Sequence, residues 1–179
     1  PGVKNGKKYG IATAFGLVSG CLVHTTLLAF GVSAVIKEND LFFLGIKIFG
    51  AIYLLYLAFL VYKSPSEIAI GNQKVENKST WQLYKQGFIM NVLNPKVTIF
   101  FLAFFPGFLF SKEIRPVFQF YILGFLFMIV SFLVFYLVAI MSSTVSSYIK
   151  AHKNIGSILK WMQIVVFVAI ALYLLFSNK

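Results

Sequence analysis

The chain of 179 residues is 59% hydrophobic and only 12% charged. Several apolar runs approach the ~20 residues that a membrane-spanning helix needs, which excludes an ordinary soluble domain and predicts an all-α integral membrane protein in a lipid bilayer. The net charge of +11 does not indicate nucleic acid as a partner, because the lysines lie between the apolar runs rather than in one patch.

Five transmembrane helices are expected in the visible chain, separated by polar segments. The predicted spans cover residues 9–36, 41–62, 87–110, 117–141 and 158–176. The longest polar segment, residues 63–86, contains Pro65 and Gly71. It is expected to link an N-terminal half, residues 1–62, to a C-terminal half, residues 87–179.

Basic residues are unevenly distributed between the two ends of the predicted spans. The N-terminal segment and the linker 63–86 are rich in lysine and should therefore be cytoplasmic. With five spans, this orientation places the C-terminus outside. The chain opens with Pro1-Gly2 and three lysines rather than with a signal peptide, and we expect the true N-terminus to lie upstream.

A weak internal repeat relates the second predicted span to the last. Residues 46–49 (IKIF) resemble residues 159–162 (LKWM), and both lead into runs rich in Leu and Tyr. If the two spans are equivalent, a sixth span must precede Tyr9, and the full-length protein contains two inverted three-helix repeats. The equivalence places Lys47 and Lys160 at opposite membrane faces and favours surface anchoring for both.

Small and polar residues mark one stretch of the first predicted span. Gly16 and Gly20 form a G-x-x-x-G pair, which favours close packing of helices in lipid. His24 is the only histidine within a predicted span and is a candidate for proton coupling; a hydrogen bond to a neighbouring helix is the alternative. Cys21 shares a face with His24, but two ligands are too few to favour a metal site.

Polar and helix-breaking residues interrupt the third predicted span, whose sequence from residue 87 to residue 108 is GFIMNVLNPKVTIFFLAFFPGF. Pro95 lacks a backbone N–H and Asn94 is a good N-cap, so a new helix is predicted to start inside the membrane. Its unpaired N–H groups, its positive dipole end and the Lys96 ammonium suit an anion such as a carboxylate. Asn91 lies one turn earlier and can hydrogen-bond the same group.

A simpler interpretation of this segment stays open on the residues alone. Lys96 lies about eight residues from Phe88, or roughly 12 Å along a helix, so its side chain could reach the headgroups while Pro95 only kinks the helix. The two interpretations predict different structures, a break beside a cavity or a continuous rod with a surface lysine.

Three stretches of the chain resemble the LysE/RhtB family of bacterial amino-acid exporters. They are GCLVHTTLLAFG (residues 20–31), IKIFGAIYLLYLAF (residues 46–59) and the segment 87–108, in which N-P-K followed by F-F-L-A-F-x-P is the most specific part. The resemblance implies a six-helix carrier of the bacterial inner membrane. Such a carrier exports amino acids or close derivatives and is driven by the proton gradient.

Two departures from the family pattern affect the expected site. The family's first helix ends in a P-G-P turn and is absent here except for Pro1-Gly2, so part of the binding site is expected outside this sequence. Cys21 stands where many members have G-D, and with no carboxylate in any predicted span a dibasic amino acid lacks a partner. The expectation is an exporter of small neutral amino acids with protons coupled through His24 and with substrate bound by Asn91, Asn94, Pro95 and Lys96.

Other classes of function fit the sequence less well. A metal-cation exporter should carry Asp, Glu or several Cys and His in its spans, and a non-transporting assembly subunit has little need of Asn94 and Lys96 at depth. No nucleophile-and-base arrangement or phosphate loop indicates an enzyme, and no cofactor is expected. The expected partners are an amino-acid substrate and protons, and a homodimer is a candidate assembly.

Overall fold

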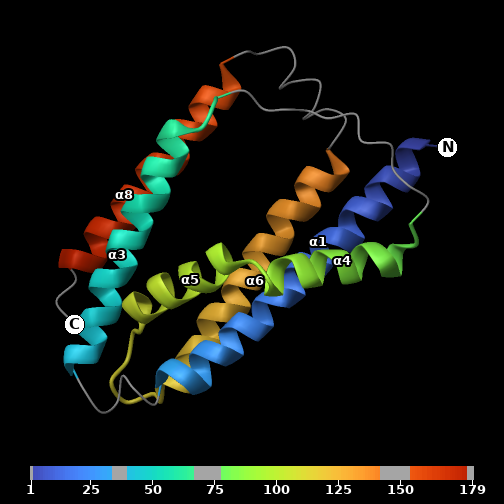
Figure 1. The fold of residues 1–179 in the computed structure, drawn as a ribbon. Helices are drawn as coiled ribbons and strands as arrows, with labels where there is room; N and C mark the ends of the chain where they lie inside the picture. The colour runs from blue at the N-terminus through green and yellow to red at the C-terminus, as the bar shows by residue number, and fades with distance from the viewer. Residues whose placement is uncertain (1, 34–39, 67–77, 142–153, 177–179) are drawn as a thin grey trace.

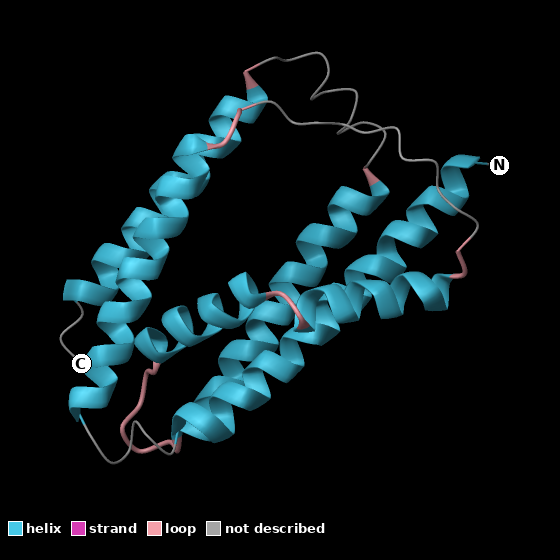
Figure 2. Ribbon diagram, viewed as in Figure 1, coloured by secondary structure: helices cyan, strands magenta, loops and turns pink. Residues whose placement is uncertain are grey.

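The computed structural model describes residues 2–33, 40–66, 78–141 and 154–176, and every regular element within these ranges is a helix (Figures 1 and 2). The elements in chain order are α1 (Gly2–Leu27), the π-helical η1 (Leu28–Val32), α3 (Asp40–Lys63), α4 (Thr80–Val92), α5 (Pro95–Phe104), the 3-10 helix η2 (Phe105–Phe108), α6 (Pro116–Ile140) and α8 (Ile155–Phe176). The predicted all-α fold is confirmed.

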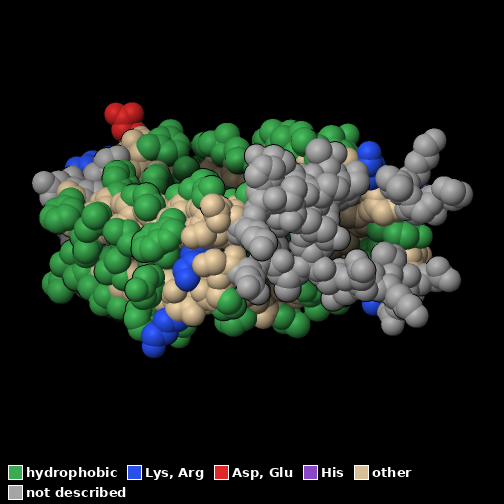
Figure 3. All heavy atoms as spheres, turned by 90° about the horizontal axis from the view of Figure 1, so that it is seen from above, with side chains coloured by type: hydrophobic (Ala, Val, Ile, Leu, Met, Phe, Trp, Pro, Cys, Tyr) green, Lys and Arg blue, Asp and Glu red, His purple; other side chains and the backbone are tan. Residues whose placement is uncertain are grey.

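Four helical stretches are long and apolar enough to cross a membrane, and α4 with α5 adds a fifth if this bent pair is one span. The four are Gly6–Val32, Leu41–Lys63, Pro116–Ile140 and Ile155–Phe176. Large hydrophobic side chains are exposed along α3, α6 and α8. Figure 3 shows hydrophobic side chains covering much of the described surface on the face it presents. Such a surface suits lipid rather than water.

The third span begins with a local capping motif inside the segment expected to be a linker. Ser79 Oγ accepts from the Gln82 backbone N–H, and Gln82 Oε1 accepts from the Ser79 backbone N–H. This capping box satisfies two otherwise unpaired donors, and α4 therefore starts at Thr80 rather than at residue 87. Residues 67–77 of the segment lie outside the described residues, as do 34–36 of the first predicted span.

Glycines bring the backbones of α1 and α4 into direct contact. A β-carbon added at Gly16 would overlap the Tyr84 carbonyl oxygen, and one added at Gly87 would overlap the Thr13 carbonyl oxygen. One added at Gly20 would lie 2.8 Å from Asn91 Oδ1. The predicted packing role of the G-x-x-x-G pair is confirmed, and it holds α4 on α1 up to the residue beside the break.

The helices form two groups that α5 and η2 join (Figure 1). One group contains α1, α4 and α6, and the other is the antiparallel pair of α3 and α8. At one end of this pair Lys160 Nζ donates to the Ser64 carbonyl oxygen at 2.7 Å. Gly50 of α3 lets Ala103 of α5 approach, since an added β-carbon would lie 2.8 Å from Ala103 Cα. The bent pair α4–α5 therefore touches both groups.

The two lysines of the weak repeat have different surroundings. Lys160 is half-buried, and its ammonium lies 5.7 Å from the centroid of the Tyr62 ring. Lys47 is only 6% exposed, and its ammonium lies 5.8 Å from the centroid of the Phe43 ring. The expectation that Lys47 is a surface anchor is therefore wrong. Lys47 lies one turn before Gly50, on the face of α3 that packs against α5, and its side chain is buried there.

Replacing Gly16 with Ala should destabilise the protein, because the new methyl group must displace the α4 backbone. Overpacking of this kind costs about 1–3 kcal/mol. The matched control is Gly45→Ala, where an added β-carbon meets nothing within 4 Å. Both changes gain similar helix propensity, so thermal unfolding in detergent should show a lower midpoint for Gly16→Ala than for the control. Equal midpoints would contradict the close contact of α1 with α4.

Candidate functional site

The third span is broken between α4 and α5. The two helices are bent by 57°, and Asn94 between them has an extended backbone with φ −84° and ψ 106°. Asn94 Oδ1 accepts from the Lys96 backbone N–H at 3.0 Å, and Pro95 occupies the first turn of α5. The predicted break and N-cap are confirmed, and the alternative of a continuous rod through this span is wrong.

A cavity of about 390 Å³ lies beside the break, a size typical of small-molecule sites. Side chains of α1, α3, α5, α6 and α8 and of the α4–α5 junction line it, so it lies where the two helix groups face each other. Its polar or sulfur-containing lining residues are Cys21, Asn91, Asn94, Lys96, Ser131 and Gln163, and its apolar ones are Leu17, Val18, Leu57, Val97, Phe100, Phe101, Phe127, Phe135 and Phe167. None of these described lining residues is acidic.

Lys96 provides the positive charge of the cavity. Its side chain is exposed and lines the cavity together with Asn94, and its ammonium forms no salt bridge among the described residues. The first backbone N–H groups of α5 all have acceptors on Asn94, since Oδ1 accepts from Lys96 and the carbonyl oxygen accepts from Val97 at 3.1 Å and from Thr98 at 3.2 Å. The expected unpaired N–H groups are therefore absent at this turn, and the positive end of the helix dipole remains. A full charge and a helix N-terminus are thus combined at one place in the cavity wall.

Asn91 lies at the contact of α4 with α1. Its side chain is 8% exposed, and its Nδ2 donates weakly to Cys21 Sγ at 3.8 Å. A sulfur acceptor is weak, and an amide nitrogen carries two hydrogens, so Nδ2 retains capacity to donate into the cavity that Asn91 lines.

His24 does not line the cavity but lies directly behind the break. It is 2% exposed, with Nε2 3.2 Å from the Asn91 carbonyl oxygen and Nδ1 3.4 Å from Thr98 Oγ1. A carbonyl oxygen can only accept, which assigns the proton to Nε2 and makes Nδ1 an acceptor for the Thr98 hydroxyl. The Thr98 hydroxyl has a second acceptor in the Asn94 carbonyl oxygen at 3.3 Å. His24 therefore ties α1 to the end of α4 and to the first turn of α5.

The structure brings together the residues that the sequence singled out. Asn91, Asn94 and Lys96 line one cavity, His24 bonds to the same junction, and Pro95 starts α5 without lining the cavity. The polar lining residues Ser131 and Gln163 were not expected from the sequence. Their signal is a polar side chain within an apolar span, which by itself does not tell which face the side chain occupies.

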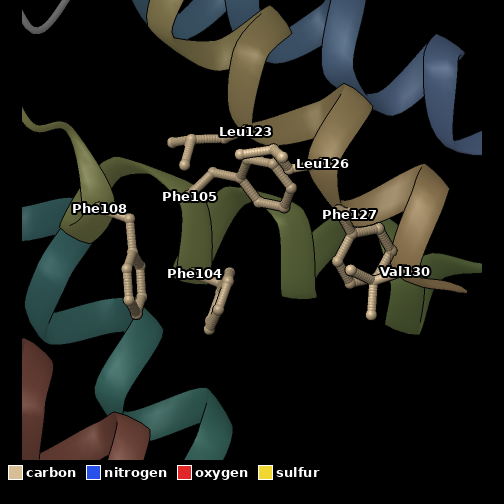
Figure 4. Close-up of a pocket in the computed structure, with 7 residues that line it drawn as sticks. All are labelled: Phe104, Phe105, Phe108, Leu123, Leu126, Phe127 and Val130. Carbon is tan, nitrogen blue, oxygen red and sulfur yellow. The ribbon is translucent and has the colours of Figure 1, made fainter.

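A second cavity of about 240 Å³ lies between α5, η2 and α6 (Figure 4). Its lining residues are Phe104, Phe105, Phe108, Leu123, Leu126, Phe127 and Val130, all of which are apolar. It offers no side-chain donor or acceptor that could orient a zwitterion. The cavity at the helix break is therefore the better candidate for a polar ligand.

The described part of the chain contains no cluster of side chains that could bind a metal ion. No group of three or more His, Cys, Asp or Glu side chains lies close enough together there to hold an ion.

The fold and the cavity define a class of protein. A multi-pass helical membrane protein with a small-molecule cavity beside a broken span has the arrangement of a secondary transporter. The chain belongs to the LysE type translocator family, whose family model matches residues 1–178. It is therefore a transporter rather than an enzyme, and the resemblance found in the sequence is confirmed.

Two proteins with similar sequences are efflux proteins. The homoserine/homoserine lactone efflux protein of Salmonella typhimurium is 25% identical over 158 residues, covering 88% of this chain and 76% of the relative. The leucine efflux protein of Klebsiella pneumoniae is 27% identical over 170 residues, covering 95% of this chain and 80% of the relative. No solved structure matches the chain.

Replacing Asn94 with Ala should lower the free energy of unfolding, because the Lys96 N–H loses its acceptor. Loss of an N-cap side chain typically costs about 1 kcal/mol. Asn94→Ser, which restores a neutral capping oxygen, is the matched control and should unfold close to the wild-type temperature in detergent. If Asn94→Ala were as stable as Asn94→Ser, the side chain would not be capping α5.

Proposed function

We propose that this chain is a secondary transporter that exports small neutral amino acids from the cytoplasm in exchange for protons. The observation that carries the proposal is the cavity at the helix break, which combines Lys96 and the N-terminus of α5 with a mainly apolar wall. The relatives that export homoserine and leucine support an amino-acid substrate.

The substrate carboxylate binds at the N-terminus of α5. The positive end of the α5 dipole favours an anion there, and the Lys96 ammonium adds a full charge and three donors within the same cavity. Asn91 Nδ2 supplies a further donor. Asn94 and Pro95 act by starting the helix at this depth, so they place the positive end of its dipole beside the carboxylate.

The substrate ammonium binds on the α4 side of the break. The last carbonyl groups of α4 and the negative end of its dipole face the junction, so the two helix ends offer opposite charges to the two ends of a zwitterion. Phenyl rings at the cavity wall, such as those of Phe100 and Phe127, can also receive a cation. No acidic residue is among the described lining residues to hold a second ammonium, which favours neutral over dibasic amino acids.

His24 couples the site to protons. When Nδ1 takes a proton, the Thr98 hydroxyl can turn to donate to the Asn94 carbonyl oxygen and accept from Nδ1–H, so both protonation states keep their hydrogen bonds. A positive His24 beside the Asn91 carbonyl oxygen opposes an ammonium at the end of α4. Proton and substrate then exclude each other, which is what antiport requires.

We further propose the orientation and location of the chain. Four helix ends lie on one side of the molecule in Figure 1. They are the N-terminal ends of α1 and α8 and the C-terminal ends of α3 and α6. Lys63 ends α3 on this side, and Lys7 and Lys8 lie near the start of α1, which supports a cytoplasmic location for this side and an outside location for the C-terminus. The membrane is the bacterial inner membrane. The inverted three-helix repeats and a homodimer stay predictions, although the antiparallel pair α3–α8 suits an inverted repeat.

Replacing Lys96 with Gln should abolish export while leaving the folded protein intact, because Lys96 is exposed and forms no salt bridge among the described residues. Loss of one charged hydrogen bond corresponds to at least about tenfold weaker export. Lys85→Gln, a change on the exposed face of α4 outside the cavity, is the matched control. Labelled homoserine and leucine can be followed in a strain lacking other exporters. Full export by Lys96→Gln would remove the carboxylate assignment.

Replacing His24 with Gln should separate transport from its proton coupling. Gln can still donate to the Asn91 carbonyl oxygen but does not titrate, so exchange of labelled for unlabelled substrate should persist in proteoliposomes while accumulation driven by a pH gradient is lost. The wild-type protein should show both activities. Gradient-driven accumulation by His24→Gln at the wild-type rate would exclude His24 as the coupling residue.

A further inference from the structure

Two polar side chains of the cavity wall have no hydrogen-bond partner. Ser131 of α6 and Gln163 of α8 both line the cavity, and neither makes a hydrogen bond within the part of the chain that the structure describes. Ser131 precedes the end of α6, and Gln163 follows the start of α8, by roughly 12–14 Å of helix each. These two helix ends lie on the same side of the molecule (Figure 1), so the two side chains lie at similar depth.

An unpaired amide at this depth is costly unless something polar faces it. In hydrocarbon no solvent molecule can hydrogen-bond an unsatisfied amide or hydroxyl, so burying one there is unfavourable. Gln163 is exposed and lines the cavity, and no described side chain hydrogen-bonds its amide. Its partner is therefore water or the cargo of the cavity.

Gln119 at the start of α6 has the hydrogen bonds of a glutamine with a structural role. Gln119 is 1% exposed, its Oε1 accepts from the backbone N–H groups of Phe110 and Ser111, and its Nε2 donates to the carbonyl oxygens of Ser111 and Ile114. All four capacities of that amide serve the turn between η2 and α6. Gln163 makes no such hydrogen bonds among the described residues, so its amide does not stabilise the fold in this way.

We propose that Gln163, assisted by Ser131, determines specificity by hydrogen-bonding the polar end of the substrate side chain. The inference rests on the proposed function, in which the helix break takes the carboxylate and the ammonium. These are the groups that all amino acids share, so polar groups from α6 and α8 meet a third polar group of the cargo. The favoured substrates are neutral amino acids with a side-chain hydroxyl or amide.

The preference follows from the cost of leaving Gln163 unpaired. An apolar side chain of equal size fills the same space but displaces the water that would otherwise bond the amide. A site that hydrogen-bonds a substrate hydroxyl therefore rejects the analogue that lacks it, whereas a purely apolar wall hardly distinguishes two isosteres.

The test compares L-homoserine with L-norvaline, which carries a methyl group in place of the hydroxyl. In proteoliposomes containing the full chain, wild type should take homoserine in preference to norvaline by at least about tenfold in competition for exchange. Gln163→Leu should lower homoserine exchange about tenfold and leave norvaline within about twofold, so that the preference disappears. Val166→Ala, an exposed position on α8 outside the cavity, is the matched control and should keep the wild-type ratio.

Three results would overturn the inference. They are a wild type without preference for homoserine, a Gln163→Leu variant that loses both substrates equally, and a variant that keeps the wild-type ratio. Ser131→Ala should lower the same ratio in the same direction and provides a second variant should Gln163→Leu fail to fold. If wild type exchanges neither compound nor leucine, the proposed function itself fails, which is distinguishable from a failure of Gln163 alone.

Discussion

A helix that starts inside a membrane must find acceptors for its first backbone N–H groups, and the rest of this structure depends on how that constraint is met. Lipid cannot hydrogen-bond the first turn of α5, so the turn must face protein, water or a ligand. Asn94 supplies these acceptors through its side-chain and carbonyl oxygens, and the cavity lies beside the junction. Irregular backbone at membrane depth is tolerated where it lines a cavity of this kind. The helix break therefore requires the cavity beside it.

The break is held in place by the close contact of α1 with α4. Gly16 and Gly20 remove the side chains that would separate the two helices, and the same helix then presents His24 to the Asn91 carbonyl oxygen. Packing and chemistry thus share one helix face. A shift of α1 along α4 would move His24 relative to the break, which gives proton binding a direct route to the geometry of the site.

Much of the fold could be predicted from the sequence, because long apolar runs and an Asn-Pro pair have strong local consequences. The all-α class, the break at Asn94 and the packing role of Gly16 follow from such local rules. The start of α4 was missed although Ser79 and Gln82 carry a capping-box pattern, because polar residues around it suggested a linker.

The features of the site that the sequence could not show depend on contacts between distant parts of the chain. His24 and Asn91 are 67 positions apart, and nothing in either local sequence pairs them. Lys47 has a long side chain that could reach the membrane surface, but the packing of the helices buries it. Gln163 lies in an apolar run whose lipid-facing and cavity-facing sides the sequence does not distinguish. Such assignments need the tertiary arrangement, because helix faces become inequivalent only when the helices pack.

The most direct test of the account is whether water and substrate reach the start of α5. Cys21 is the only cysteine, so Val97→Cys in a Cys21→Ala background puts a single thiol into the cavity beside Lys96. A charged, membrane-impermeant thiol reagent should label it, homoserine should slow the labelling, and Ile129→Cys on the exposed face of α6 should stay unlabelled. A Val97→Cys thiol that resists the reagent, or that reacts equally fast with and without substrate, would contradict a substrate site at the helix break.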